Sequence, residues 1–168
     1  MIPLFLGLTI ANLTALLITI ALGYFSIAAP GSLRTLHMVA GFLTALLSVT
    51  VHCTVFTYFM ATSKWVQHAV TVKGLDAAYV APTRSFKAQA YPAALGAMFV
   101  VFLTAIFGAA VDNQMLRSGW HHAMALTSVG INLLAAVTEY GAISRNGKLI
   151  DQLLGQIPES DRSDSPTG

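Results

Sequence analysis

The feature that most constrains this chain is an apolar stretch at residues 33–62 that contains two histidines. After Arg34 the stretch has no Asp, Glu, Lys or Arg, yet His37 and His52 lie within it. A run of this length and hydrophobicity can cross the hydrocarbon core of a bilayer as a single helix. Ionisable side chains are costly inside a membrane and usually mark a functional site. The stretch therefore predicts a transmembrane helix with two functional candidates.

The composition of the whole chain supports a membrane protein. Of its 168 residues, 55% are hydrophobic and 10% are charged, and the mean hydropathy is +0.68. Soluble domains carry about a quarter charged residues. The net charge of +2 gives no indication of a nucleic-acid partner. With Cys53 as its one cysteine, the chain has neither an internal disulfide nor the paired-cysteine motif that attaches a c-type haem. The lipid bilayer is therefore the first expected partner.

Apolar segments along the chain predict an all-α, integral membrane four-helix bundle. The expected helices occupy residues 3–29, 33–62, 89–111 and 120–143. The first segment lacks a basic region before it and is longer than the apolar part of a signal peptide, so we expect it to be retained. Residues 63–88 are expected to form a polar connector, and residues 151–168 a polar, disordered cytoplasmic tail. Short turns elsewhere predict a single domain over residues 1–150 with up-down-up-down topology.

The distribution of basic residues predicts the orientation. The middle connector and the C-terminal segment contain Lys64, Lys73, Arg84, Lys87, Arg145, Lys148 and Arg162, whereas the opposite side has Arg34 and Arg117. Because cytoplasmic loops of membrane proteins are enriched in Lys and Arg, both termini are expected in the cytoplasm. The pattern is typical of a bacterial inner (plasma) membrane protein. His37 and His121 would then lie near the outer face.

Small and polar residues recur at helical spacing on the second and fourth predicted helices. The second helix has His37, Gly41, Thr44 and Ser48 on one face, and the fourth has His121, Ala125, Ser128, Asn132, Ala135 and Glu139. In a membrane such faces turn toward the bundle interior and the apolar faces toward lipid. Helices two and four are expected to run in the same direction, so His37 and His121 would lie at similar depth.

This arrangement suits a cofactor held between two helices. Facing helices of a bundle can place imidazoles on either side of a metal or a haem, and imidazole is the commonest metal ligand. Gly41, one turn after His37, would leave a gap for a flat macrocycle. The pattern of His37, Gly41, His52 and His121 resembles the four-helix membrane b-type cytochromes, in which histidines from two helices ligate haem b.

The resemblance implies a membrane electron carrier rather than a stand-alone catalyst. Haem b would be ligated through its iron by His37 and His121, with His52 and His122 as further candidates. Fifteen residues separate His37 from His52, roughly 22 Å along a helix, which would allow two haems, one per leaflet. No histidine faces His52 on the fourth helix, so a second haem would lack its second ligand. The sequence therefore favours one haem over two. Quinone, other membrane subunits or a second copy of the chain are the implied partners.

Two alternatives from the residues remain open. His52 and Glu139, with Asn132 nearby, could form a structural pair in a dry core, or a metal or proton site suited to transport or oxidase assembly. The polar faces could also simply hold helices together, as Ser, Thr and Asn commonly do in membranes. The protein would then be a structural subunit without a cofactor, and His122 an interfacial residue beside Trp120.

Overall fold

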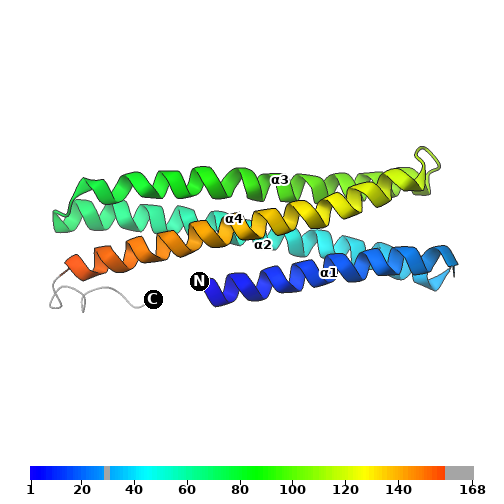
Figure 1. Ribbon diagram of the computed structural model, residues 1–168, viewed down its shortest axis with the longest axis horizontal. Helices are drawn as coiled ribbons and strands as arrows, with labels where there is room; N and C mark the ends of the chain where they lie inside the picture. The colour runs from blue at the N-terminus through cyan, green and yellow to red at the C-terminus, as the bar shows by residue number, and fades with distance from the viewer. Residues whose placement is uncertain (29–30, 158–168) are drawn as a thin grey trace.

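The computed structural model describes residues 1–28 and 31–157, and within these residues all regular secondary structure is helical. Four long helices are present in this part of the chain, with one short 3-10 helix, η1 (Ala77–Tyr79), between the second and third (Figure 1). The long helices are α1 (Ile2–Ala28), α2 (Ser32–Lys73), α3 (Val80–Asp112) and α4 (Ser118–Gln156). All four are long and apolar enough to cross a membrane. The predicted all-α class is therefore confirmed, and each predicted span lies on a helix that is long and apolar enough to cross a membrane.

The four helices lie side by side along one long axis (Figure 1). Each packs against its neighbours in sequence, and α4 also packs against α1. Helices α2 and α4 are therefore diagonal partners that face each other across the core. This diagonal brings the two polar faces identified in the sequence together.

The predicted polar connector at residues 63–88 is wrong, because most of it is helical. Helix α2 continues to Lys73 and α3 already begins at Val80. The added turns bury a second apolar cluster, formed by Val66, Ala69, Val70 and Leu153. Helix α2 ends where Gly74 adopts the left-handed conformation (φ 63°, ψ 31°) that glycine tolerates without steric cost.

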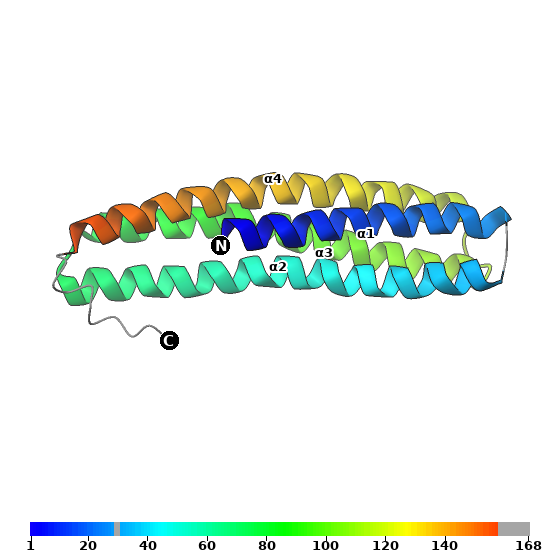
Figure 2. The ribbon, with the colours of Figure 1, turned by 90° about the horizontal axis from the view of Figure 1, so that it is seen from below.

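Helix α4 also extends beyond its predicted end at residue 143 and continues to Gln156. Residues 151–156 of the predicted tail are therefore helical, and residues 158–168 lie outside the described residues. The 42 residues of α2 make a helix about 60 Å long, twice the roughly 30 Å that a bilayer core requires. We use "three-helix extension" for residues 63–73 of α2, 80–88 of α3 and 145–156 of α4, beyond the start of α1 (Figure 2).

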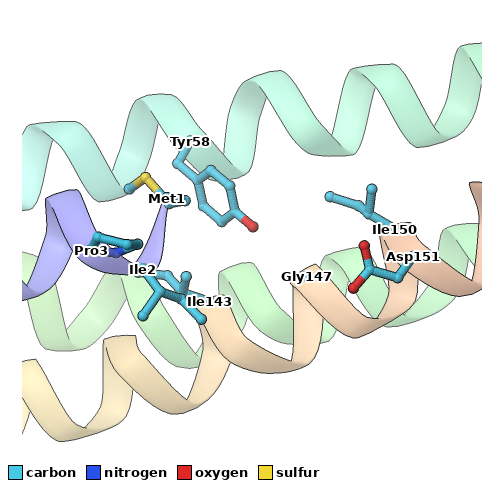
Figure 3. A pocket seen from close by; sticks show the side chains of 8 residues that line it. All are labelled: Met1, Ile2, Pro3, Tyr58, Ile143, Gly147, Ile150 and Asp151. Atoms are coloured by element: carbon cyan, nitrogen blue, oxygen red, sulfur yellow. The ribbon is translucent and has the colours of Figure 1, made fainter.

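A central apolar cluster separates this extension from the polar part of the core. It consists of Phe5, Val51, Val55, Phe59, Ala90, Ala142 and Ile143. At its edge a pocket of about 370 Å³ lies beside the first residues of α1, with Tyr58 on α2 and Asp151 on α4 among its lining residues (Figure 3). The polar core lies on the other side of the cluster, toward His37 and His121.

Candidate functional site

His37 is held against the backbone of α1. Its Nδ1 lies 3.0 Å from the carbonyl oxygen of Thr19. The ring also covers Gly23, where an added Cβ would stand 3.0 Å from the His37 Cε1 atom. A glycine at this position lets the imidazole approach the helix closely enough to reach the carbonyl one turn earlier.

His121 is held in the same way by the other half of the bundle. Its Nδ1 lies 3.1 Å from the carbonyl oxygen of Thr104 on α3. A Cβ on Gly108 would again stand 3.0 Å from the His121 Cε1 atom. The pairs α1–α2 and α3–α4 therefore present one histidine each with the same backbone partner and the same glycine contact.

The two half-buried imidazoles meet across the α2–α4 diagonal, as the sequence predicted. Their ring centroids are 6.1 Å apart, with 76° between the ring planes. A carbonyl only accepts hydrogen bonds, so each Nδ1 must carry a proton, and in the neutral tautomer each Nε2 keeps a free lone pair. Within the described residues neither Nε2 has a hydrogen-bond partner. Metal-ligating histidines commonly donate their other N–H to a carbonyl in this manner.

The other predicted cofactor residues at this end take different positions. The His122 ring packs on Tyr24, with centroids 5.0 Å apart, and its centroid is 6.3 Å from that of His121. Gly41 faces α1, where its Cβ would lie 3.7 Å from the Thr19 methyl group. The gap expected beside Gly41 is therefore filled by Thr19, and the glycines that accommodate imidazoles are Gly23 and Gly108.

His52 belongs to a separate polar network in the middle of the bundle. It is 2% exposed, and its Nδ1 lies 2.8 Å from Oε1 of Glu139, which is 1% exposed. Its Nε2 lies 3.3 Å from Oδ1 of Asn132. Because both ring nitrogens are engaged, His52 has no nitrogen left for a metal in this arrangement. The pairing with Glu139 was one of the alternatives left open by the sequence.

Asn132 is the centre of this network. Its Oδ1 also accepts hydrogen bonds from Asn12 Nδ2 and Ser48 Oγ, each at 3.1 Å. Its Nδ2 donates to the carbonyl oxygen of Ser128 at 2.9 Å. One side chain of α4 thus connects α1, α2 and α4 inside the membrane-spanning part of the bundle.

Several buried polar atoms near this network have no protein partner. Four of them belong to the same region of the core, namely Thr9 Oγ1, Asn12 Oδ1, Ser128 Oγ and Glu139 Oε2. In a membrane an unsatisfied polar group costs several kcal/mol, about the strength of a hydrogen bond in an apolar medium. This part of the core is therefore built to accept further hydrogen-bonding groups.

The repeated histidine motif is the feature that our reading of the sequence missed. A Thr and a Gly four residues apart precede each histidine, as Thr19, Gly23 and His37 in one half and Thr104, Gly108 and His121 in the other. The signal was visible as a threonine–glycine pair on the helix before each histidine. Its meaning required knowing that the preceding helix packs beside the histidine.

No family model, curated protein or solved structure matches this chain.

Proposed function

We propose that the protein is a membrane-embedded electron carrier that binds one haem b between His37 and His121. The observation that carries the proposal is the matched pair of imidazoles, each donating Nδ1–H to a main-chain carbonyl and each retaining a free Nε2. This is the tautomer that a metal ligand requires. Helix packing alone does not require two ionisable side chains to face each other inside a membrane bundle, because such residues are costly there.

The spacing of the rings fits this assignment. Imidazole nitrogens bind metals at about 2 Å, so two imidazoles that shared one metal ion would have ring centres roughly 6 Å apart. The observed centroid separation is 6.1 Å.

The number of available ligands also favours haem over a bare metal ion. Among the described residues, no three His, Cys, Asp or Glu side chains gather in a group that could hold a metal ion. A structural zinc site takes four protein ligands and a catalytic one takes three. Haem needs only axial ligands from the protein, because the porphyrin supplies the others.

In this proposal the chain positions the ligands and the haem supplies one-electron chemistry at its iron. The Thr19 and Thr104 carbonyls hold both imidazoles in the ligating tautomer. The absence of a Cβ at Gly23 and Gly108 leaves the space that the two rings occupy beside α1 and α3. His52 is not assigned to a second haem, since Glu139 and Asn132 occupy both of its ring nitrogens.

We further propose that the helices alternate in direction across a bacterial inner membrane, with both termini in the cytoplasm. Exposed basic residues on the three-helix extension, namely Lys64, Arg84, Arg145 and Lys148, support the cytoplasmic placement of that end. An electron carrier needs a donor and an acceptor, for which quinone and other membrane subunits, or a second copy of the chain, are the candidates.

Absorption spectroscopy of the purified full chain tests the haem assignment. A reduced-minus-oxidised spectrum should show the α band of a b-type haem, with one haem per chain. His37→Ala and His121→Ala should each abolish or shift this band. His68→Ala is the matched control, because His68 is exposed on α2 far from the pair. The assignment would be contradicted if the folded protein lacked the band, or if neither substitution changed it.

A further inference from the structure

We propose that His52 and Glu139 form a proton-binding site that exchanges its proton along the polar core toward His37 and His121, while the central apolar cluster closes the opposite path. The site is distinct from the proposed haem site and does not depend on it. It rests on the hydrogen-bond geometry of the pair, on the unpartnered polar atoms beside it, and on the asymmetry of the core.

The hydrogen bonds of Asn132 determine which nitrogen of His52 is protonated. The Asn132 amide nitrogen donates to the Ser128 carbonyl, so its Oδ1 must be the acceptor for His52 Nε2 at 3.3 Å. His52 Nε2 therefore carries a proton. At 2.8 Å the contact between His52 Nδ1 and Glu139 Oε1 needs a second proton between the two atoms.

The bridging proton makes the pair electrically neutral, whether it resides on the imidazole or on the carboxyl group. Its loss leaves a neutral His52, protonated on Nε2, beside a Glu139 carboxylate, with a net charge of −1. The proton passes to a water molecule in the polar core on the side of His37, and its return from that water restores the neutral pair. Because a buried unpaired charge is costly, release and return of this proton change the electrostatics of the core.

In the described part of the chain, no second ionisable side chain forms a hydrogen bond or ion pair with His52 or Glu139. Helix α1 presents Asn12 and Thr9 to the network, and α2 and α4 add Ser48, Asn132 and Ser128. The fully buried residues of α3 at this depth are alanines, at positions 90, 94 and 97. Within residues 1–28 and 31–157, His52 is the one ion-pair partner of the Glu139 carboxyl.

Polar groups continue from this pair toward His37 and His121. Ser48 lies one helical turn from Thr44, whose Oγ1 is 2.9 Å from Oγ1 of Thr19. The carbonyl of Thr19 is the partner of His37. Ser128 Oγ, Asn12 Oδ1 and Glu139 Oε2 are buried beside this route without protein partners. Water bound to such atoms would complete a chain of hydrogen bonds along which a proton can move.

In the opposite direction the core next to the pair is apolar. On α2 the next buried residues after His52 are Val55 and Phe59, and on α4 those after Glu139 are Ala142 and Ile143. Phe5 of α1 completes this apolar layer. The Tyr91 hydroxyl beside this layer donates to the carbonyl oxygen of Phe56 at 3.5 Å, and the contact from Asn146 Nδ2 to the Tyr58 hydroxyl at 3.0 Å lies beyond the layer near the pocket. Proton exchange is therefore one-sided.

Infrared spectroscopy on the full chain in vesicles, inserted in one orientation, tests this inference. The Glu139 signal is the carboxyl or carboxylate band that disappears in Glu139→Gln. With impermeant buffers, a pH change on the side of His37 should alter this band, and the same change on the side of Tyr58 should not. The measurement needs no haem, so its result is independent of the haem assignment.

Two variants identify the route. Ser128→Ala removes a hydroxyl that has no protein partner, so the fold should be retained while the response slows roughly tenfold, as loss of one hydrogen-bonding step implies. Thr62→Val, beyond the apolar cluster, is the matched control and should leave the rate unchanged. A band that responds to neither side would identify a purely structural pair. A response from the Tyr58 side, or equal rates in both variants, would overturn the proposed route.

Discussion

At the scale of single residues, Gly23 and Gly108 decide where the two facing histidines can lie. Each glycine is covered by an imidazole, and each leaves room for that ring to reach a carbonyl on the neighbouring helix. Any larger residue would place a Cβ at 3.0 Å from the ring. The tautomer of each histidine, and hence the free Nε2, thus depends on a residue that itself has no functional group.

Gly23→Ala and Gly108→Ala should therefore displace His37 and His121. In a helix interior the Gly→Ala change itself stabilises by about 1 kcal/mol. Any loss of stability or of bound haem would therefore come from the clash between the new Cβ and the imidazole ring. We expect a lower haem content and a shifted α band in both variants, measured as haem per chain after purification. Gly130→Ala, where nothing lies within 4 Å of the new Cβ, should behave as the unmodified protein or melt slightly higher. Equal spectra in all three variants would contradict this role of the glycines.

At the scale of helices, the extra length of α2, α3 and α4 is accompanied by packing of the added turns against one another. Val66 and Leu153 are fully buried in the three-helix extension, against Ala69 and Val70. A helix surrounded by water needs such an apolar face, because propensity alone stabilises it little. The extension is therefore a packed unit of three helices that continues the bundle.

Leu153→Ala should destabilise the extension while leaving the histidine pair intact. Removing a buried leucine side chain costs about 2–5 kcal/mol. Hydrogen exchange should show faster exchange of backbone amides in the last turns of α4 and in α2 near Val66. The absorption spectrum should be unchanged. Leu134→Ala is the control, since Leu134 is 65% exposed on the membrane-spanning part of α4. Exchange that accelerates equally in both variants would argue against a separate packing unit.

At the scale of the whole molecule, the core is layered along the bundle axis. The facing histidines come first, then the Asn132 network, then the central apolar cluster, and finally the extension with its basic surface. An exposed ion pair, Arg34 to Asp112 at 2.7 Å, links α2 and α3 at the histidine end. Such exposed pairs contribute little to stability. The layers place the proposed haem site at His37 and His121 apart from the proposed proton site at His52 and Glu139.

Cysteine labelling should establish which end faces the cytoplasm. In a Cys53→Ser background, Lys148→Cys should react with an impermeant thiol reagent added from the cytoplasmic side. Arg117→Cys should react from the outside, because it lies at the opposite end of α4. Leu134→Cys, expected to face lipid, should react with neither addition. Reaction of Lys148→Cys from outside would reverse the proposed orientation.

The sequence by itself determined the all-α class, the four apolar spans and the two polar faces on α2 and α4. These follow from hydrophobic length and helical periodicity, which are properties of residue order alone. The same periodicity also placed His37 opposite His121 and His52 opposite Glu139. The ends of the helices were misjudged, because Val66 and Leu153 stabilise the extension only through contact with each other's helices.

Only the tertiary structure decided which nitrogen of each histidine is engaged. Every residue has a backbone carbonyl, so the sequence does not distinguish the carbonyls of Thr19 and Thr104 from any others. Their selection depends on how closely α1 approaches α2 and α3 approaches α4, which Gly23 and Gly108 permit. Likewise, the orientation of the Asn132 amide follows from its three donors on two other helices and its own Ser128 carbonyl. The chemistry of a buried polar group depends on its partners, and these are set when the helices pack.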